Sequence, residues 1–298
     1  MKSLEEAHRS DSMRKHLLIA IRDSKLCPQG IRFVGNFFQK PKKIEISLLY
    51  LTAGSASQAS GTMWEDGEDT NLESVSAREN QCFAIAKRNL LRKGYVESDI
   101  KTKIRATVKG TGRDILSEGS SGYYDAVVLG SRASSFLEGL VMGDVGRQIL
   151  EHGVTFPIWF CRDIEEDRRD ILLCLDGSKT SDKVADHVGY MLEGEAKHSI
   201  TLLYIDKGQG LDTKEIFARA TDILIEHNFP LEKITSKIIS SSRVVHSILR
   251  TVEKEKYAVV ALGWAGRTPQ TGIRKWLAGE KCREVLHNIK KVALWIVP

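Results

Sequence analysis

The sequence contains the same series of apolar segments twice, in the same order. Four segments of the first half have a counterpart in the second half: LLIAIRDS at 17–24 and ILLCLDGS at 171–178, SLLYL at 47–51 and TLLYI at 201–205, YDAVVLG at 124–130 and YAVVALG at 257–263, and PIWF at 157–160 and ALWI at 293–296. The last pair brings Trp159 and Trp295 into register. Two copies of one folding unit are therefore predicted, each with its own candidate site.

The length of the chain agrees with this duplication. Its 298 residues are enough for two domains of ordinary size. We assign residues 1–161 to the first domain (copy one) and residues 170–298 to the second (copy two). The segment between them, 162–169, reads RDIEEDRR and has neither glycine nor proline. A linker this short and charged predicts that the two domains sit in a fixed pairing.

Short apolar runs alternate with longer segments of helical periodicity in both copies. This alternation predicts an α/β fold whose parallel strands are buried on both faces. In copy one we expect strands at 17–21, 44–51, 126–130 and 156–161, and helices at 77–93, 113–118 and 144–152. In copy two we expect strands at 171–175, 200–205, 234–239, 258–262 and 292–297, and helices at 180–193, 213–227, 243–254 and 280–288.

Copy one contains an insertion relative to copy two. The offset between matching positions is 154 for Leu49 and Leu203, but 134 for Ile104 and Ile238, so about twenty residues are added between these points. The polar stretch 54–76 is the candidate for the insertion, and we expect it to be a mobile surface loop.

Composition excludes several classes of protein. With 42% hydrophobic and 28% charged residues the chain should be globular. No apolar run approaches the ~20 residues of a membrane span, and the polar N-terminal stretch lacks the apolar run of a secretory signal, so we expect a cytoplasmic protein without a membrane partner. Its net charge of +5 is mild and its cations are interspersed with acidic residues, which argues against a nucleic-acid partner. Five cysteines without a CxxC pair and eight histidines without an HExxH spacing predict no metal site.

Glycines follow the fourth long strand of each copy and recur before the next helix. The two series are Gly130-Ser131-Arg132-Ala133 with Gly143-Asp144, and Gly263-Trp264-Ala265-Gly266 with Gly279-Glu280. A glycine-bearing loop at the carboxyl end of a strand can bring backbone N–H groups close to a phosphate, and the following helix N-terminus adds partial positive charge. Glycines alone are a weak signal, because turns need them too.

Together with the duplicated strand order, this pattern resembles the universal stress protein family. Nucleotide-binding members of that family carry Gly-x2-Gly-x9-Gly-(Ser/Thr), and the resemblance runs from about Arg14 to Pro298 as two tandem domains. It implies a Rossmann-like fold in which each domain has an open parallel five-stranded sheet of order 3-2-1-4-5 with helices on both faces. It also implies that the domains pair through their last strands, PIWF and ALWIV, as an intramolecular pseudo-dimer. Further association into a homodimer stays open.

The departures from the family pattern bear on nucleotide binding. Copy one has Ala133 in place of the second glycine and Asp144 in place of the Ser/Thr, while copy two has Glu280 in place of the Ser/Thr and a spacing three residues too long. A carboxylate at ~4 Å from a phosphate charge is unfavourable by up to ~4 kcal/mol under surface-like screening. We therefore expect the copy-one site, with Gly130 and Gly143, to be degenerate.

Copy two keeps more of the family's nucleotide-binding pattern. Many family members have an aspartate after the first strand, close to bound adenosine, and copy two has Asp176 there where copy one has Arg22. The resemblance thus implies a candidate ATP or adenine-nucleotide site formed by Asp176, Gly263, Gly266 and Gly279. Three cations of the long loop, Arg267, Arg274 and Lys275, could offset Glu280.

Two functional hypotheses follow from the sequence. The first is a regulatory binding module that acts in stress tolerance through protein partners, with degenerate nucleotide sites and without enzymatic activity. The second is an adenine-nucleotide-binding switch or slow ATPase that uses copy two. An adenylating α/β enzyme is not favoured, because neither an SGGxDS-type loop nor a HIGH-type motif follows the first strand.

Overall fold

The computed structural model describes residues 14–21, 28–52, 70–131, 155–195, 197–264 and 280–298. Copy one forms strands β1 (Lys15–Ile21), β2 (Ile44–Thr52), β3 (Ile100–Ala106), β4 (Ala126–Ser131) and β5 (Ile158–Arg162), and helices α2 (Gln29–Phe37), α3 (Thr70–Arg92) and α4 (Thr111–Ser121). Copy two forms strands β6 (Ile171–Leu175), β7 (Ile200–Asp206), β8 (Ile234–Ser240), β9 (Val259–Gly263) and β10 (Ala293–Val297), and helices α7 (Lys179–Leu192), α8 (Thr213–Glu226), α9 (Val244–Glu255) and α11 (Glu280–Asn288).

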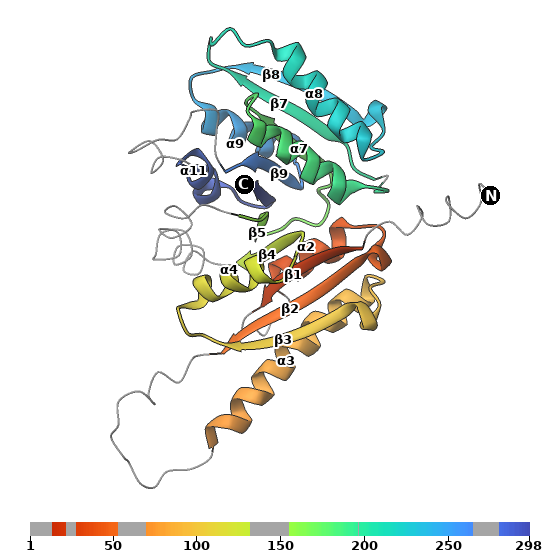
Figure 1. Cartoon of the computed structure of the whole chain (residues 1–298), viewed down its shortest axis with the longest axis vertical. Coiled ribbons are helices and arrows are strands. Elements are labelled where there is room, and N and C mark those ends of the chain that lie inside the picture. Colours follow the sequence, from red (N-terminus) through yellow and green to blue (C-terminus); the bar gives the residue numbers. More distant parts are fainter. Residues whose placement is uncertain (1–13, 22–27, 53–69, 132–154, 196, 265–279) are drawn as a thin grey trace, which may run out of the picture.

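All ten strands belong to one sheet of order β3-β2-β1-β4-β5-β10-β9-β6-β7-β8. Within each copy the order is 3-2-1-4-5 and the neighbouring strands are parallel, which confirms the fold class. Figure 1 shows copy one below and copy two above, with the sheet continuing from one into the other.

The last strands of the two copies pair as the family resemblance implied, and this pairing makes the two five-stranded sheets continuous. Strands β5 and β10 are antiparallel neighbours, with Trp159 opposite Trp295, and this pair joins the two halves. The physical reason is that four of the five residues of β5 and all five of β10 are apolar, so each five-stranded sheet alone would leave an apolar edge strand with unpaired N–H and C=O groups.

Helices cover both faces of the sheet. Helices α2, α3, α7 and α8 pack on one face, where the buried side chains of both copies form a single cluster. Helices α4, α9 and α11 pack on the other face over a second cluster, which also spans both copies. Alternate residues of β1 point to opposite faces, so that Leu17 and Ile19 enter the first cluster and Leu18 enters the second.

Part of the insertion in copy one is helical. Helix α3 begins at Thr70, so 70–76 is helical where the sequence predicted a loop, and residues 53–69 lie outside the described residues. Helix α3 has 23 residues against 14 in its counterpart α8, so part of the added length extends a helix. The reason for the error is composition, because a helical turn can be as polar as a loop.

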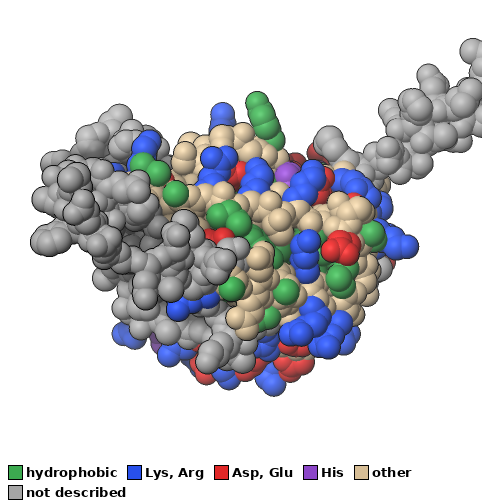
Figure 2. All heavy atoms as spheres, turned by 90° about the horizontal axis from the view of Figure 1, so that it is seen from below, with side chains coloured by type: hydrophobic (Ala, Val, Ile, Leu, Met, Phe, Trp, Pro, Cys, Tyr) green, Lys and Arg blue, Asp and Glu red, His purple; other side chains and the backbone are tan. Residues whose placement is uncertain are grey.

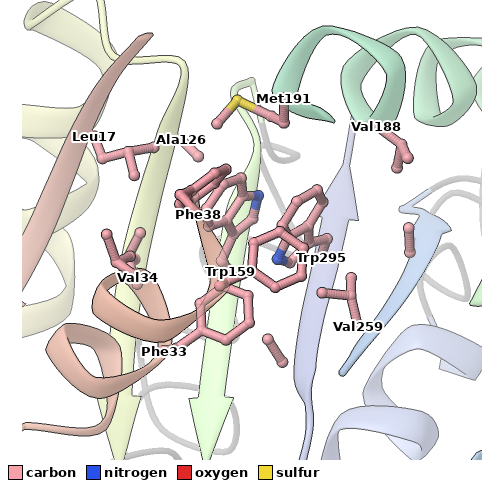
Figure 3. Packing of buried hydrophobic residues seen from close by; sticks show 14 of the residues in the cluster. Leu17, Phe33, Val34, Phe38, Ala126, Trp159, Val188, Met191, Val259 and Trp295 are labelled. Carbon is pink, nitrogen blue, oxygen red and sulfur yellow. The ribbon is translucent and has the colours of Figure 1, made fainter. Parts of the chain in front are cut away.

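Two stacked tryptophans lie at the junction of the copies. The rings of Trp159 and Trp295 are 4.0 Å apart and almost parallel, and both side chains are fully buried. Phe33 of α2 and His187 of α7 each meet both indoles edge-on. Figure 3 shows Phe33 and Phe38 against this pair. Buried aromatic pairs of this kind contribute about 0.5–1.5 kcal/mol beyond their buried area.

The two indole N–H groups differ. The N–H of Trp159 donates to Nε2 of His187 at 3.1 Å, which makes that ring nitrogen an acceptor. Phe33 holds the corresponding place in copy one and has no acceptor, and Trp295 Nε1 is buried without a partner in the part of the chain that the structure describes. Burial lowers the pKa of His187 to about 3, so the ring stays neutral and keeps its acceptor.

Polar contacts from loop and helix ends complete the junction. Lys15 Nζ donates to the carbonyl of Met191 at 3.1 Å, and the Glu195 carboxylate accepts the N–H groups of Gln39 and Lys40 at 2.7 and 3.1 Å. Each of these bonds joins one copy to the other. Because the Glu195 side chain is buried, its two charge-assisted bonds hold the loop after α2 firmly against copy two.

The neutral state of His187 predicts a pH dependence of stability. The free energy of unfolding should fall as the pH drops from 6.5 towards 3. In this range His187 binds a proton in the unfolded chain but stays neutral when it is buried in the folded protein. The loss attributable to this ring approaches about 1.4 kcal/mol per pH unit. A His187→Gln variant retains an acceptor for Trp159 and does not titrate, so urea unfolding between about pH 7 and about pH 4 should show a shallower slope than wild type.

The matched control for this variant is His246→Gln, which removes an exposed histidine of α9. It should keep the wild-type slope. If His187→Gln also keeps that slope, the ring does not stay neutral in the folded protein and this assignment is wrong.

Candidate functional site

The carboxyl ends of the parallel strands of copy two meet at one edge of the sheet. Asp176 directly follows β6, and its Oδ1 accepts the N–H of Ser178 at 3.0 Å. The Ser178 hydroxyl in turn caps α7 by accepting the N–H of Ser181 at 3.2 Å. Gly177 between them has φ +76°, and a Cβ there would lie 2.8 Å from Cδ1 of Ile216. This turn therefore requires glycine and fixes the Asp176 carboxylate at the strand end.

Two lysines lie close together at the same strand ends. Lys207 follows β7 and Lys281 is the second residue of α11, and the two charges are near enough to act on one another. Burial lowers the pKa of Lys281, and the neighbouring Lys207 lowers it further, while the charge of Asp176 acts in the opposite direction. Two cations beside the N-terminus of a helix are an arrangement that favours an anionic ligand.

The cysteine after Lys281 has a structural role. The Cys282 thiol donates to the carbonyl of Gly263 at 2.8 Å and so ties α11 to the end of β9. Burial raises the pKa of this thiol far above its ordinary value, and the charge of nearby Asp176 adds to the effect. The thiol is therefore neutral and is not a nucleophile.

The equivalent strand end of copy one is covered by the chain itself. A Cβ on Gly130 would lie 2.5 Å from the backbone nitrogen of Gly30 and 3.2 Å from that of Gln29. The first turn of α2 thus packs directly on the end of β4, and Gly130 permits this close approach of two backbone segments. Here the glycine that the sequence assigned to a ligand contacts the protein's own helix.

The structure places only part of the predicted site. Asp176 and Gly263 both lie at the carboxyl ends of copy-two strands. Cys282 links them, because its thiol bonds to the Gly263 carbonyl and is affected by the charge of Asp176. Gly266, Gly279, Gly143, Ala133 and Asp144 lie outside the described residues, as do the loop cations Arg267, Arg274 and Lys275. Glu280 is the first residue of α11, as the helix prediction for 280–288 required.

Sequence reasoning missed Lys207 and Lys281. The only available signal was position, because Lys207 follows a predicted strand and Lys281 follows the Gly279-Glu280 pair. Their proximity depends on β7 and α11 meeting at one edge, which the linear sequence does not show.

The described part of the chain contains neither a metal-binding cluster nor a membrane-spanning helix. Within the described ranges, no group of three or more His, Cys, Asp or Glu side chains is arranged to hold a metal ion. Among the described helices, none combines the length and apolar character needed to cross a membrane.

The close contact at Gly130 predicts a stability effect. Gly130→Ala should lower the free energy of unfolding by about 3 kcal/mol, because the added methyl group meets backbone and not a flexible side chain. In the control Gly35→Ala, the added Cβ meets only the Lys93 side chain at 3.3 Å, and alanine in a helix gains up to about 1 kcal/mol. Chemical denaturation of both variants measures the difference, and equal effects would contradict the packing described for Gly130.

Comparison with known proteins agrees with the strand order. The model of the universal stress protein family matches residues 13–159. A universal stress protein from Archaeoglobus fulgidus DSM 4304 has a similar structure, with a TM-score of 0.65, 14% sequence identity and coverage of 95% of this chain and 96% of that one. A putative universal stress protein from Pseudomonas aeruginosa UCBPP-PA14 gives 0.55 and 14%, with coverage of 96% and 94%.

No curated protein sequence matches the chain. The family match covers copy one, and the structural similarity, which concerns the fold alone, extends over both copies. Copy one belongs to the universal stress protein family, and the whole chain has the fold of the two universal stress proteins described above.

Proposed function

We propose that this protein is a regulatory binding module of stress tolerance that acts by binding and not by chemistry. The observation that supports this most directly is the covered strand end of copy one, where the first turn of α2 lies against Gly130. Copy one then serves as a structural partner for copy two, to which it is joined through β5 and β10. In this proposal, copy two carries whatever ligand responsiveness the protein has.

The lysine pair of copy two favours a second candidate function, the binding of an adenine nucleotide. Unit charges about 4 Å apart interact by about 4 kcal/mol under surface-like screening, so two adjacent ammonium groups repel one another until an anion lies between them. The charge of Lys207 acts on Lys281 in this sense and lowers the pKa of Lys281. They also add positive charge next to Glu280, the residue that most disfavours a phosphate in the sequence pattern.

Asp176 supplies the other half of this candidate site. Its position after β6 matches the family's adenosine-side aspartate, and its carboxylate is held by the N–H of Ser178. A nucleotide whose sugar lies near Asp176 and whose phosphates lie near the two lysines would contact both the carboxylate and the ammonium groups of this site.

Titration with ATP separates the two candidates. In isothermal titration calorimetry we expect about one ATP per chain for wild type, and at least about tenfold weaker binding for Lys207→Ala and for Lys281→Ala, since a lost charge-assisted bond contributes about 1.5–3 kcal/mol. The control Lys214→Ala removes an exposed lysine of α8 and should bind as wild type does.

Other results of the ATP titration would contradict one of the two candidate functions or the location of the site. If wild type does not bind ATP, the nucleotide-binding function is excluded and the module acts through protein partners. Two ATP per chain would contradict the structural role of copy one. Binding that neither lysine substitution weakens would place the nucleotide away from this strand edge.

A further inference from the structure

Six of the eight exposed large apolar side chains among the described residues form three pairs at equivalent or nearly equivalent positions of the two copies, and only Val108 and Tyr123 of copy one have no such counterpart. Leu91 and Ile225 are 40% and 43% exposed, Ile104 and Ile238 are both 51% exposed, and each pair is separated by the same 134 residues. Val96 at 39% and Leu231 at 60% correspond to within one position. Ile104 and Ile238 lie in β3 and β8, the two outer strands of the ten-stranded sheet, while Leu91 and Ile225 lie near the ends of α3 and α8, the helices that precede these strands in the chain.

The outer strand of copy one is protected by charge. Lys101, Lys103 and Arg105 alternate along β3 and so share one face of the sheet. Lys103 and Arg105 both contact the single carboxylate of Glu118, at 2.7 and 2.6 Å, which leaves a surplus of positive charge at this edge. Figure 2 looks onto the molecule from this end and shows many Lys and Arg side chains with smaller apolar areas between them. Lysine and arginine on an edge strand oppose pairing with another strand.

The outer strand of copy two lacks this protection. The seven residues of β8, ITSKIIS, contain one charged side chain, and Lys237 forms an ion pair with Glu255. The strand is rich in β-branched residues, and among the described strands its neighbour is β7 on one side only. Its other side carries a row of backbone N–H and C=O groups that can bond to another strand.

We propose that β8 is a self-association surface that pairs antiparallel with β8 of a second copy of this chain. A register centred on Ile238 sets the two Ile238 side chains opposite each other, pairs Ser236 with Ser240, and places each Lys237 opposite Ile239. No charged residue then faces a like charge. The same operation on β3 would set Lys103 opposite Arg105, which is unfavourable.

The difference between the two outer strands indicates that the partner of β8 is a second copy of this chain. A two-fold β8–β8 contact repeats the way in which β5 and β10 already join the two copies inside the chain, by antiparallel pairing of outer strands. Because such a contact uses the same surface on both molecules, it closes at two. The charged β3 edges then form the two ends of a continuous twenty-stranded sheet and stop further growth.

Mass measurement with matched variants tests the proposal. Light scattering after size exclusion, over about a hundredfold range of protein concentration, should show wild type at twice the chain mass at the upper end. Ile238→Lys should raise the dimer dissociation constant by at least about tenfold. Ile104→Lys changes the equivalent, equally exposed residue of copy one and should leave the dimer intact.

A second variant covers the case in which Ile238→Lys lowers the melting temperature. Ser236→Lys keeps every apolar side chain, alters an exposed position of β8 and should also dissociate the dimer. A monomeric wild type, a species that grows beyond a dimer, or a dimer that Ile104→Lys weakens as much as Ile238→Lys would each overturn the proposal.

Discussion

The antiparallel pairing of β5 with β10 is the contact on which the rest of the molecule depends. It lines up Trp159 with Trp295, stacks their rings at 4.0 Å and merges two five-stranded sheets into one. Because both apolar clusters run across this junction, neither half has a core of its own that ends at its last strand. The buried Glu195 carboxylate and the Lys15 ammonium reinforce the junction from the loops around it.

With the copies fixed in this way, their equivalent strand ends have different roles. In copy one the chain folds back on itself, and Gly130 accommodates the backbone of α2. In copy two a glycine turn holds Asp176, and Lys281 interacts with both Asp176 and Lys207. The same topology therefore provides one closed end and one charged end, and the difference arises from local residues alone.

Much of this architecture could be predicted from the sequence. Strands buried on both faces must be continuous apolar runs, so their order and the register of the tryptophans were visible in the repeats. Helix α2 was not, because two glycines in nine residues weaken its helical pattern. Strand β3 was not in the list of predicted strands either, because alternating cations hide an edge strand. The lysine pair depends on contacts between distant segments, for which the linear sequence has no signal.

The unequal partners of the two indoles show what joining both copies in one chain makes possible. In an association of identical subunits, a residue on one side of the two-fold axis must recur on the other side. Here His187 contacts the tryptophan pair from copy two and Phe33 contacts it from copy one, so the N–H of Trp159 is bonded while that of Trp295 has no partner among the described residues. A substitution in a dimer of identical chains appears at both equivalent positions. In this chain a substitution changes only one of the two, so the two sides of the junction can diverge in evolution.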